Sequence, residues 1–161
     1  MMRSQKGITL VEVLLSLVLV TIISGIIINF FTMGLKSYQK VNSEVLLNDE
    51  ANYVMSQFVN HIFVAVKAEE INAPDPCTSL IKVTNMDGAE TTLGFQNNRA
   101  VINGQPVSAP KYSFSCDPSS LSKIEVQGNN VVVKMFVEDK ESDHDLQLEL
   151  NSRVSYLNVK N

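Results

Sequence analysis

Hydrophobic residues are concentrated near the N-terminus in one long run. Residues 13–35 are 23 consecutive uncharged residues, most of them Leu, Val and Ile. As an α-helix the run would be about 34 Å long at ~1.5 Å per residue, slightly more than the ~30 Å hydrocarbon layer of a bilayer. The apolar core of a secretory signal peptide has only about 7 to 15 residues, so this run is too long for one. We therefore predict a membrane-spanning helix.

A helical pattern continues beyond the apolar run. Apolar residues there recur mostly at steps of three and four, and charged and amide residues occupy the other face. The apolar positions are Tyr38, Val41, Val45, Leu46, Val54, Phe58, Ile62 and Val66. The first proline is Pro74, so no proline interrupts the helix before it. The pattern predicts one continuous helix from residue 8 to Lys67 or Glu70. Its segment 8–35 is apolar on all sides, and its segment 36–70 is amphipathic.

Residues 71–161 have the pattern of short strands separated by turns. The alternation of Leu146, Leu148 and Leu150, and turn signals such as Asn103-Gly104, are typical of half-buried antiparallel strands. The predicted strands are residues 80–84, 91–95, 99–102, 112–116, 123–126, 131–137 and 146–156. The expected fold class is α+β, with an antiparallel sheet, connected as a meander, packed on the Val54 and Phe58 face of the helix.

The charge balance and its distribution bear on partners and orientation. The chain has 13 Lys and Arg against 17 Asp and Glu, a net charge of −4. This balance argues against a protein that binds nucleic acid through a basic surface, and we expect no nucleic-acid site. Arg3 and Lys6 precede the apolar run, although Lys36 and Lys40 stand just beyond it. By the positive-inside rule we expect the N-terminus in the cytoplasm and the acid-rich remainder outside the cytoplasmic membrane.

Glu12 is the one charged residue within the apolar stretch that begins at Ile8, and a carboxylate in such a position signals function. Its sequence context is Lys6-Gly7-Ile8-Thr9-Leu10-Val11-Glu12. This context, with the basic leader before it, resembles the processing site of type IV prepilins and of the pseudopilins of type II secretion and competence systems. The resemblance implies that prepilin peptidase removes residues 1–7 by cutting between Gly7 and Ile8, and methylates the new amino group of Ile8. Ile8 departs from the family's most frequent first mature residue, which is Phe.

The resemblance also implies a pilin-like architecture and partners that are other pilin or pseudopilin subunits. Glu12 has a physical role in such an assembly. A carboxylate in an apolar helix bundle is costly unless it is paired. The ammonium that cleavage creates at Ile8 of a neighbouring, axially staggered subunit is a suitable partner, and the pair would fix the axial register.

Two classes of function are open. The first is a structural subunit that is processed and then packed through its apolar helix into a pilus or pseudopilus. The second is a single-pass, membrane-anchored domain with a binding or sensor role. Within the first class, Asn29 stands where major pilins usually have a proline, and Glu12 argues against the tip pseudopilin that lacks this acid. We expect a minor pilin or minor pseudopilin. Motility, adhesion, secretion and DNA uptake stay open as roles of its fibre.

Other chemistry is sparse. Cys77 and Cys116 are the only cysteines, and an even number in an exported domain favours a disulfide over two buried thiols. His61 and His144 stand alone, and we interpret His61 as a helix-face residue rather than a metal ligand. The acidic run 138–145 lacks the spacing and the turn glycine of a calcium loop, which favours a solvated hairpin over a cation site. We expect no enzyme activity, no resident metal and no cofactor.

Overall fold

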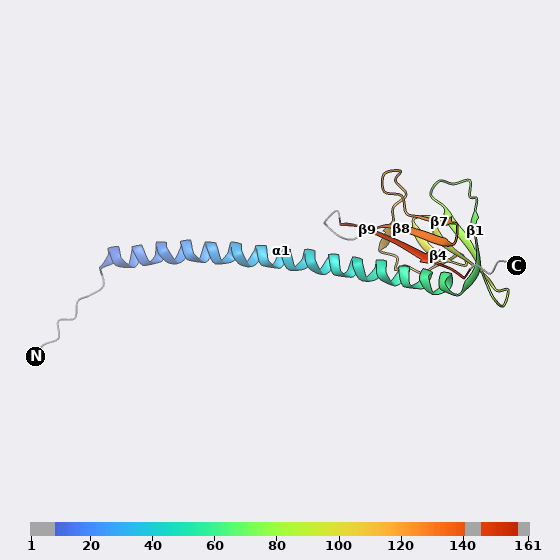
Figure 1. Cartoon of the computed structure of the whole chain (residues 1–161). Helices are drawn as coiled ribbons and strands as arrows, with labels where there is room; N and C mark the ends of the chain where they lie inside the picture. Colours follow the sequence, from blue (N-terminus) through green and yellow to red (C-terminus); the bar gives the residue numbers. More distant parts are fainter. Residues whose placement is uncertain (1–8, 141–145, 158–161) are drawn as a thin grey trace, which may run out of the picture. The chain divides into compact units, whose positions relative to one another are not determined.

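A computed structural model of the chain describes residues 9–140 and 146–157. Within these residues one long helix, α1 (Leu10–Phe63), is followed by strands. The chain divides into two compact units, one ending at Val41 and the other beginning at Asn42. The strands gather around the part of α1 that belongs to the second unit (Figure 1). The predicted α+β class is confirmed.

The second unit buries one face of α1. The buried residues of the helix are Leu47, Ala51, Val54, Met55, Phe58 and Ile62. Their spacing keeps them on one side of a helix with 3.6 residues per turn. The predicted contact face, which contains Val54 and Phe58, is therefore confirmed. The four predicted apolar positions between residues 38 and 46 are exposed instead, because the strands cover the helix only from Leu47 onward.

The first sheet is an antiparallel meander. Its spatial order is β1-β2-β3-β4-β5, so each strand pairs with its neighbours in sequence. The strands are β1 (Ala65–Ile71), β2 (Ser79–Asn85), β3 (Glu90–Gln96), β4 (Arg99–Ile102) and β5 (Gln105–Pro106). Asn103 and Gly104, with φ of 51° and 75°, form the two-residue turn between β4 and β5, as expected for an Asn-Gly hairpin. The sequence pattern predicts β2, β3 and β4 to within one residue at each end.

β1 corrects the sequence-based prediction, which extends the helix to Lys67 or Glu70. The residues around Ala68 have helix-forming composition, but intrinsic helix preference amounts to less than about 1 kcal/mol per residue. In the structure β1 pairs with β2 along its length, and Ala65 and Ala68 are buried. The pairing and burial outweigh the local preference, so the helix ends at Phe63.

The second sheet is also antiparallel and has β8 at its centre. β6 and β7 pair with different parts of β8, and β9 pairs with it from Asn130 to Glu138. The strands are β6 (Tyr112–Phe114), β7 (Lys123–Gln127), β8 (Asn130–Asp139) and β9 (Gln147–Ser155). The single sheet expected from the sequence is therefore two sheets. The first sheet ends at Pro106, which has no N–H group with which to continue a strand ladder.

Side chains join the two sheets at the edge of β7 that no described strand pairs with. The Ser79 hydroxyl accepts a hydrogen bond from the Ile124 N–H at 2.9 Å and donates one to the Ile124 carbonyl at 3.0 Å. The Glu70 carboxylate accepts a hydrogen bond from the Val126 N–H at 2.7 Å. These bonds satisfy backbone groups of β7 that would otherwise lack partners.

Three phenylalanines link the helix to both sheets. Phe58 on α1 meets Phe95 on β3 edge to face, with ring centroids 5.6 Å apart, and Phe95 packs against Phe114 on β6 at 5.3 Å. None of the three is more than 2% exposed. The Glu50 carboxylate on α1 also accepts a hydrogen bond from the Ala109 N–H at 2.7 Å. Apolar packing and a charge-assisted hydrogen bond together fix the second part of the helix on the strands.

Candidate functional site

Glu12 lies in the first turn of α1, which begins at Leu10. Thr9 caps the helix. Its hydroxyl accepts a hydrogen bond from the Glu12 N–H at 3.3 Å, and its carbonyl oxygen accepts bonds from the N–H groups of Glu12 at 3.0 Å and Val13 at 3.3 Å. Thr9 and Glu12 therefore occupy the N-cap and N3 positions, where Thr and Glu are favoured. The carboxylate stands near the positive end of the helix dipole.

The predicted cleavage site, Gly7 and Ile8, lies outside the described residues. The described residues begin directly after it, and Thr9, Leu10 and Glu12 are all exposed. The Glu12 side chain is therefore accessible to a partner.

Between Leu10 and Leu35, α1 presents apolar side chains in every direction. Each large apolar residue in this stretch is at least half exposed. An 18-residue window of the helix has a mean hydropathy of 2.7, and none of that window is buried. The core helix of a soluble domain would be covered by its own domain. This segment is uncovered, and it is long and apolar enough to span a membrane.

The helix itself satisfies hydroxyl side chains within this stretch. Ser16, Thr21 and Thr32 each donate to the carbonyl oxygen three residues earlier, at 2.8, 2.7 and 3.0 Å. Such bonds are the expected solution in a hydrocarbon layer, which offers no water to a hydroxyl. These three polar residues are therefore compatible with insertion into a membrane.

Residues 2–28 match the family model of the prokaryotic N-terminal methylation motif. The chain carries the type IV prepilin signal. This is the cleavage and methylation signal of prepilins and pseudopilins, so the resemblance of residues 6–12 to the processing site of these proteins is confirmed. The matched segment includes Glu12 and most of the apolar run, and it ends before the strands begin. No curated protein and no solved structure matches the chain.

The chain that carries this signal also has the predicted disulfide. Cys77 and Cys116 are bonded, with their Cα atoms 5.2 Å apart. Cys77 stands just before β2 and Cys116 follows β6, so the bond connects the two sheets. The Asp75 carboxylate supports the turn at Cys77 by accepting hydrogen bonds from the Cys77 N–H at 3.2 Å and the Thr78 hydroxyl at 3.0 Å. A disulfide is the expected state of an exported domain.

The remaining candidates for chemistry stay apart from one another. His61 is half-buried on α1, and the described residues contain no group of three or more His, Cys, Asp or Glu able to hold a metal ion. Glu138 pairs with Gln147, so the acidic run begins at the end of β8, next to its pairing with β9. His144 and the rest of that run, residues 141–145, lie outside the described residues.

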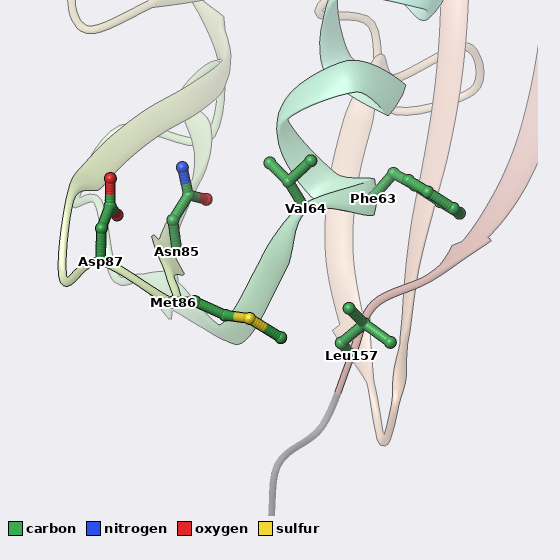
Figure 2. A pocket seen from close by; sticks show the side chains of 6 residues that line it. All are labelled: Phe63, Val64, Asn85, Met86, Asp87 and Leu157. Atoms are coloured by element: carbon green, nitrogen blue, oxygen red, sulfur yellow. The ribbon is translucent and has the colours of Figure 1, made fainter.

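An apolar hollow of about 420 Å³ lies near the end of α1 (Figure 2). It is lined by Phe63, Val64, Asn85, Met86, Asp87 and Leu157. Met86 points toward Leu157 across the hollow. The charged residue in the lining, Asp87, accepts a hydrogen bond from the Ala89 N–H at 3.0 Å. The lining offers apolar surface and holds no side chains arranged as a nucleophile with its base.

Charged pairs on the strands are local surface pairs. Lys123 donates a hydrogen bond to Glu125 on the same strand, which lowers the pKa of the carboxyl and raises the pKa of the ammonium. Lys67 and Glu69, 2.7 Å apart on β1, shift each other's pKa in the same directions and for the same reason. Pairs of this exposed kind contribute little to stability. They do not indicate a catalytic acid or base.

Sequence reasoning included Thr9 in the motif but missed its role as the helix cap. The signal was present, because Thr-x-x-Glu directly before an apolar run is the capping-box pattern. The roles of Glu50 and Ser79 had no such signal. Both side chains bond to backbone groups more than 40 positions away in sequence, and no local pattern encodes such a contact.

Proposed function

We propose that the chain is a minor pilin or minor pseudopilin, a structural subunit of a type IV pilus or of a related type II secretion or competence pseudopilus. Prepilin peptidase cuts it between Gly7 and Ile8 and methylates Ile8, and the mature subunit assembles through its N-terminal helix. One observation carries the proposal: the uncovered apolar part of α1 coincides with the methylation motif and has Glu12 in its first turn.

Cleavage changes the charge at the start of the helix. It removes Arg3 and Lys6 and leaves an ammonium at Ile8, four residues before Glu12. Within the described residues the Glu12 carboxylate takes part in no ion pair or hydrogen bond. In a bundle of parallel, axially staggered helices, the ammonium of one subunit pairs with Glu12 of the next. The pair offsets the desolvation of the carboxylate and fixes the stagger between subunits.

Before assembly the subunit is anchored in the cytoplasmic membrane with its N-terminus in the cytoplasm. Arg3 and Lys6 support this orientation, and the Cys77–Cys116 disulfide supports an extracytoplasmic place for the strands. Asn29 in place of a proline supports a minor rather than a principal subunit. The partners are prepilin peptidase, the membrane and other pilin or pseudopilin subunits, and the chain acts as a building unit without catalysing a reaction.

The mature N-terminus is the first test. Intact mass spectrometry of the protein from its own cells should give a chain that begins at N-methylated Ile8. Gly7→Val should block processing and leave the precursor in the membrane, because a β-branched side chain then stands next to the bond to be cut. Gly34→Val is the matched control and should be processed normally. An uncut chain in the wild type would contradict the proposal and favour a permanently anchored binding or sensor domain.

Fibre incorporation tests the role of Glu12. Glu12→Ala should insert into the membrane and be cut at Gly7, since a costly charge has been removed from the apolar stretch. Its amount in sheared fibres should fall because the staggered pair is lost. Asp49→Ala, which removes a carboxylate of the same helix outside the apolar run, should be incorporated like the wild type. Normal incorporation of Glu12→Ala would show that Glu12 does not set the register.

A further inference from the structure

Asn29 differs from the hydroxyl side chains of the apolar run. The polar residues within residues 13–35 are Ser16, Thr21, Ser24, Asn29 and Thr32. Three of the four hydroxyls donate to carbonyl oxygens of the helix. The fourth, Ser24, can reach the same kind of acceptor by rotation about one bond. The Asn29 side chain makes no hydrogen bond within the part of the chain that the structure describes. Ser24 and Asn29 are thus the two polar side chains of the run without a hydrogen bond in the described residues, and Asn29 is the one that carries an amide.

A single helix can accept an N–H of an amide side chain, as Asn48 donates to the Glu44 carbonyl at 3.2 Å, but it cannot satisfy the amide's carbonyl oxygen. The amide has two N–H donors and a carbonyl acceptor. Backbone N–H groups in the middle of a helix are already bonded to carbonyl oxygens one turn earlier, so they are not available to the Asn29 carbonyl. The nearby Thr32 hydroxyl donates to the backbone carbonyl of Asn29 at 3.0 Å instead. The amide therefore needs a partner outside its own helix.

Asn29 would lie too deep in the bilayer for its amide to hydrogen-bond to water or to lipid headgroups. If residues 13–35 span the bilayer, Asn29 is six residues from the end of the span, or about 9 Å along the helix axis. The Asn side chain is too short to reach the interface from that depth, unlike Lys or Arg. A second helix in the membrane is the remaining source of hydrogen-bonding groups.

The surface around Asn29 permits a second helix to come close. Gly25 lies one turn earlier on the same side, and apart from the adjacent residues and helix backbone no atom of the described chain lies within 4 Å of the place where a Cβ would stand. Nothing within this chain therefore requires glycine there. Thr21 lies one turn before Gly25, again on the same side. Small residues at this spacing let the backbones of membrane helices approach closely. A hydrogen bond to the Asn29 amide would favour such an approach.

We propose that Asn29 pairs with Asn29 of a second copy of this chain within the membrane, before either subunit enters a fibre. Every copy carries the same basic N-terminus and inserts in the same orientation, so two copies are parallel and their amides lie at the same depth. The amide is self-complementary, because each copy donates an N–H to the side-chain carbonyl oxygen of the other about a two-fold axis. The proposal rests on the membrane-spanning role of residues 13–35 in the proposed function and does not require cleavage at Gly7.

Association of the full-length chain in a bilayer tests the pair. The chain is labelled at Met86→Cys, an exposed turn position, while Cys77 and Cys116 stay bonded. Donor- and acceptor-labelled copies are mixed in vesicles of phosphatidylethanolamine and phosphatidylglycerol, and energy transfer is followed as the ratio of protein to lipid is lowered. Asn29→Leu should weaken association by about 3- to 30-fold, the range measured for hydrogen bonds between membrane helices. Asn29→Gln keeps an amide and should restore most of the association.

Ser16→Ala is the matched control, because it removes a hydroxyl that the helix already satisfies. It should associate like the wild type. The pair is contradicted if Asn29→Leu associates as strongly as the wild type, if Ser16→Ala is weakened equally, or if the wild type is monomeric at every ratio. Resistance to alkaline carbonate extraction is measured on the same vesicles. If carbonate extracts the wild type, the membrane span of the proposed function is contradicted. If the wild type is retained but Asn29→Leu does not change its association, the Asn29 pair alone is contradicted.

Discussion

The Cβ that Gly94 lacks would lie 2.1 Å from the carbonyl oxygen of Ser79 on the neighbouring strand. The same Cβ would be 3.0 Å from Cγ2 of Ile124 on β7, and Gly94 has a φ of 147°, which residues with a side chain rarely adopt. Ser79 and Ile124 are also the residues whose hydrogen bonds join the two sheets. Gly94 therefore gives β2, β3 and β7 the room to meet.

Gly94→Ala should destabilise the folded unit by about 3 kcal/mol or more, because strain in the backbone and overpacking each cost roughly 1–3 kcal/mol. Gly88→Ala is the control: Gly88 also has a positive φ, 82°, but open space where its Cβ would stand. It should lose only about 1 kcal/mol. Urea denaturation of both variants measures the difference. Equal losses would show that the contact with Ser79 is not the cause.

A fragment of residues 36–161 should be soluble and folded. The buried face of α1 begins at Leu47, so the truncation removes apolar surface without removing core. Circular dichroism should show both helix and strand, and unfolding should be cooperative. An insoluble or unfolded fragment, with the full-length chain folded in detergent, would mean that the first 35 residues belong to the core.

Phe58→Ala in that fragment should cost about 3–5 kcal/mol, because a fully buried aromatic ring that contacts Phe95 is replaced by a cavity. Tyr53→Ala changes a half-exposed aromatic of the same helix and should cost less than about 1 kcal/mol. Chemical denaturation gives both values. A small loss for Phe58→Ala would indicate that the helix is not held through this ring.

Reduction of the Cys77–Cys116 bond should lower the Tm of the fragment by on the order of ten degrees. The bond closes a loop with a sequence separation of 39, which contributes roughly 4 kcal/mol through the entropy of the unfolded chain. Calorimetry with and without a reductant measures the change, and the double variant Cys77→Ser, Cys116→Ser should behave like the reduced protein in both conditions. A reductant that shifts the double variant as well would reveal an effect unrelated to the bond.

Glu125→Gln should reduce stability at neutral pH and not at low pH. The hydrogen bond from Lys123 lowers the pKa of Glu125 in the folded state, so its contribution is present above the ordinary glutamate pKa of about 4.3 and is lost as the pH falls through the folded value. Tm measured from pH 7 to pH 2 should therefore converge for the two proteins. Because the pair is surface-exposed, added salt should narrow the difference at pH 7. A difference that persists at pH 2 would contradict the ionic origin.

The elements with strong local patterns are those that the sequence predicts. Leu148 and Leu150 alternate with exposed residues as expected for β9, and Asn103-Gly104 marks the hairpin between β4 and β5. The exceptions are decided by contacts between distant segments. Ala68 lies in a helix-like sequence but is buried in β1 through pairing with β2, and Pro106 ends a two-residue strand too short to have a pattern.

The site was predictable to a different degree. Glu12 stands out as a lone charge among apolar residues, and its motif is readable from the chain alone. The cap at Thr9 follows a known local rule and could have been predicted. The division into two sheets could not, because the Ser79 hydroxyl that joins them bonds to a residue 45 positions away.

The disulfide also has a mechanical consequence. It encloses the chain from Cys77 to Cys116, which contains β2 to β6, and leaves α1 outside the covalent loop. When a subunit is stretched between its helix and its C-terminus, the load passes directly from one cysteine to the other. The enclosed residues cannot lengthen, so the bond removes about 130 Å of extension at ~3.4 Å per residue. Under tension, the oxidised subunit therefore extends less than the reduced subunit, in which the residues between the two cysteines can also be stretched.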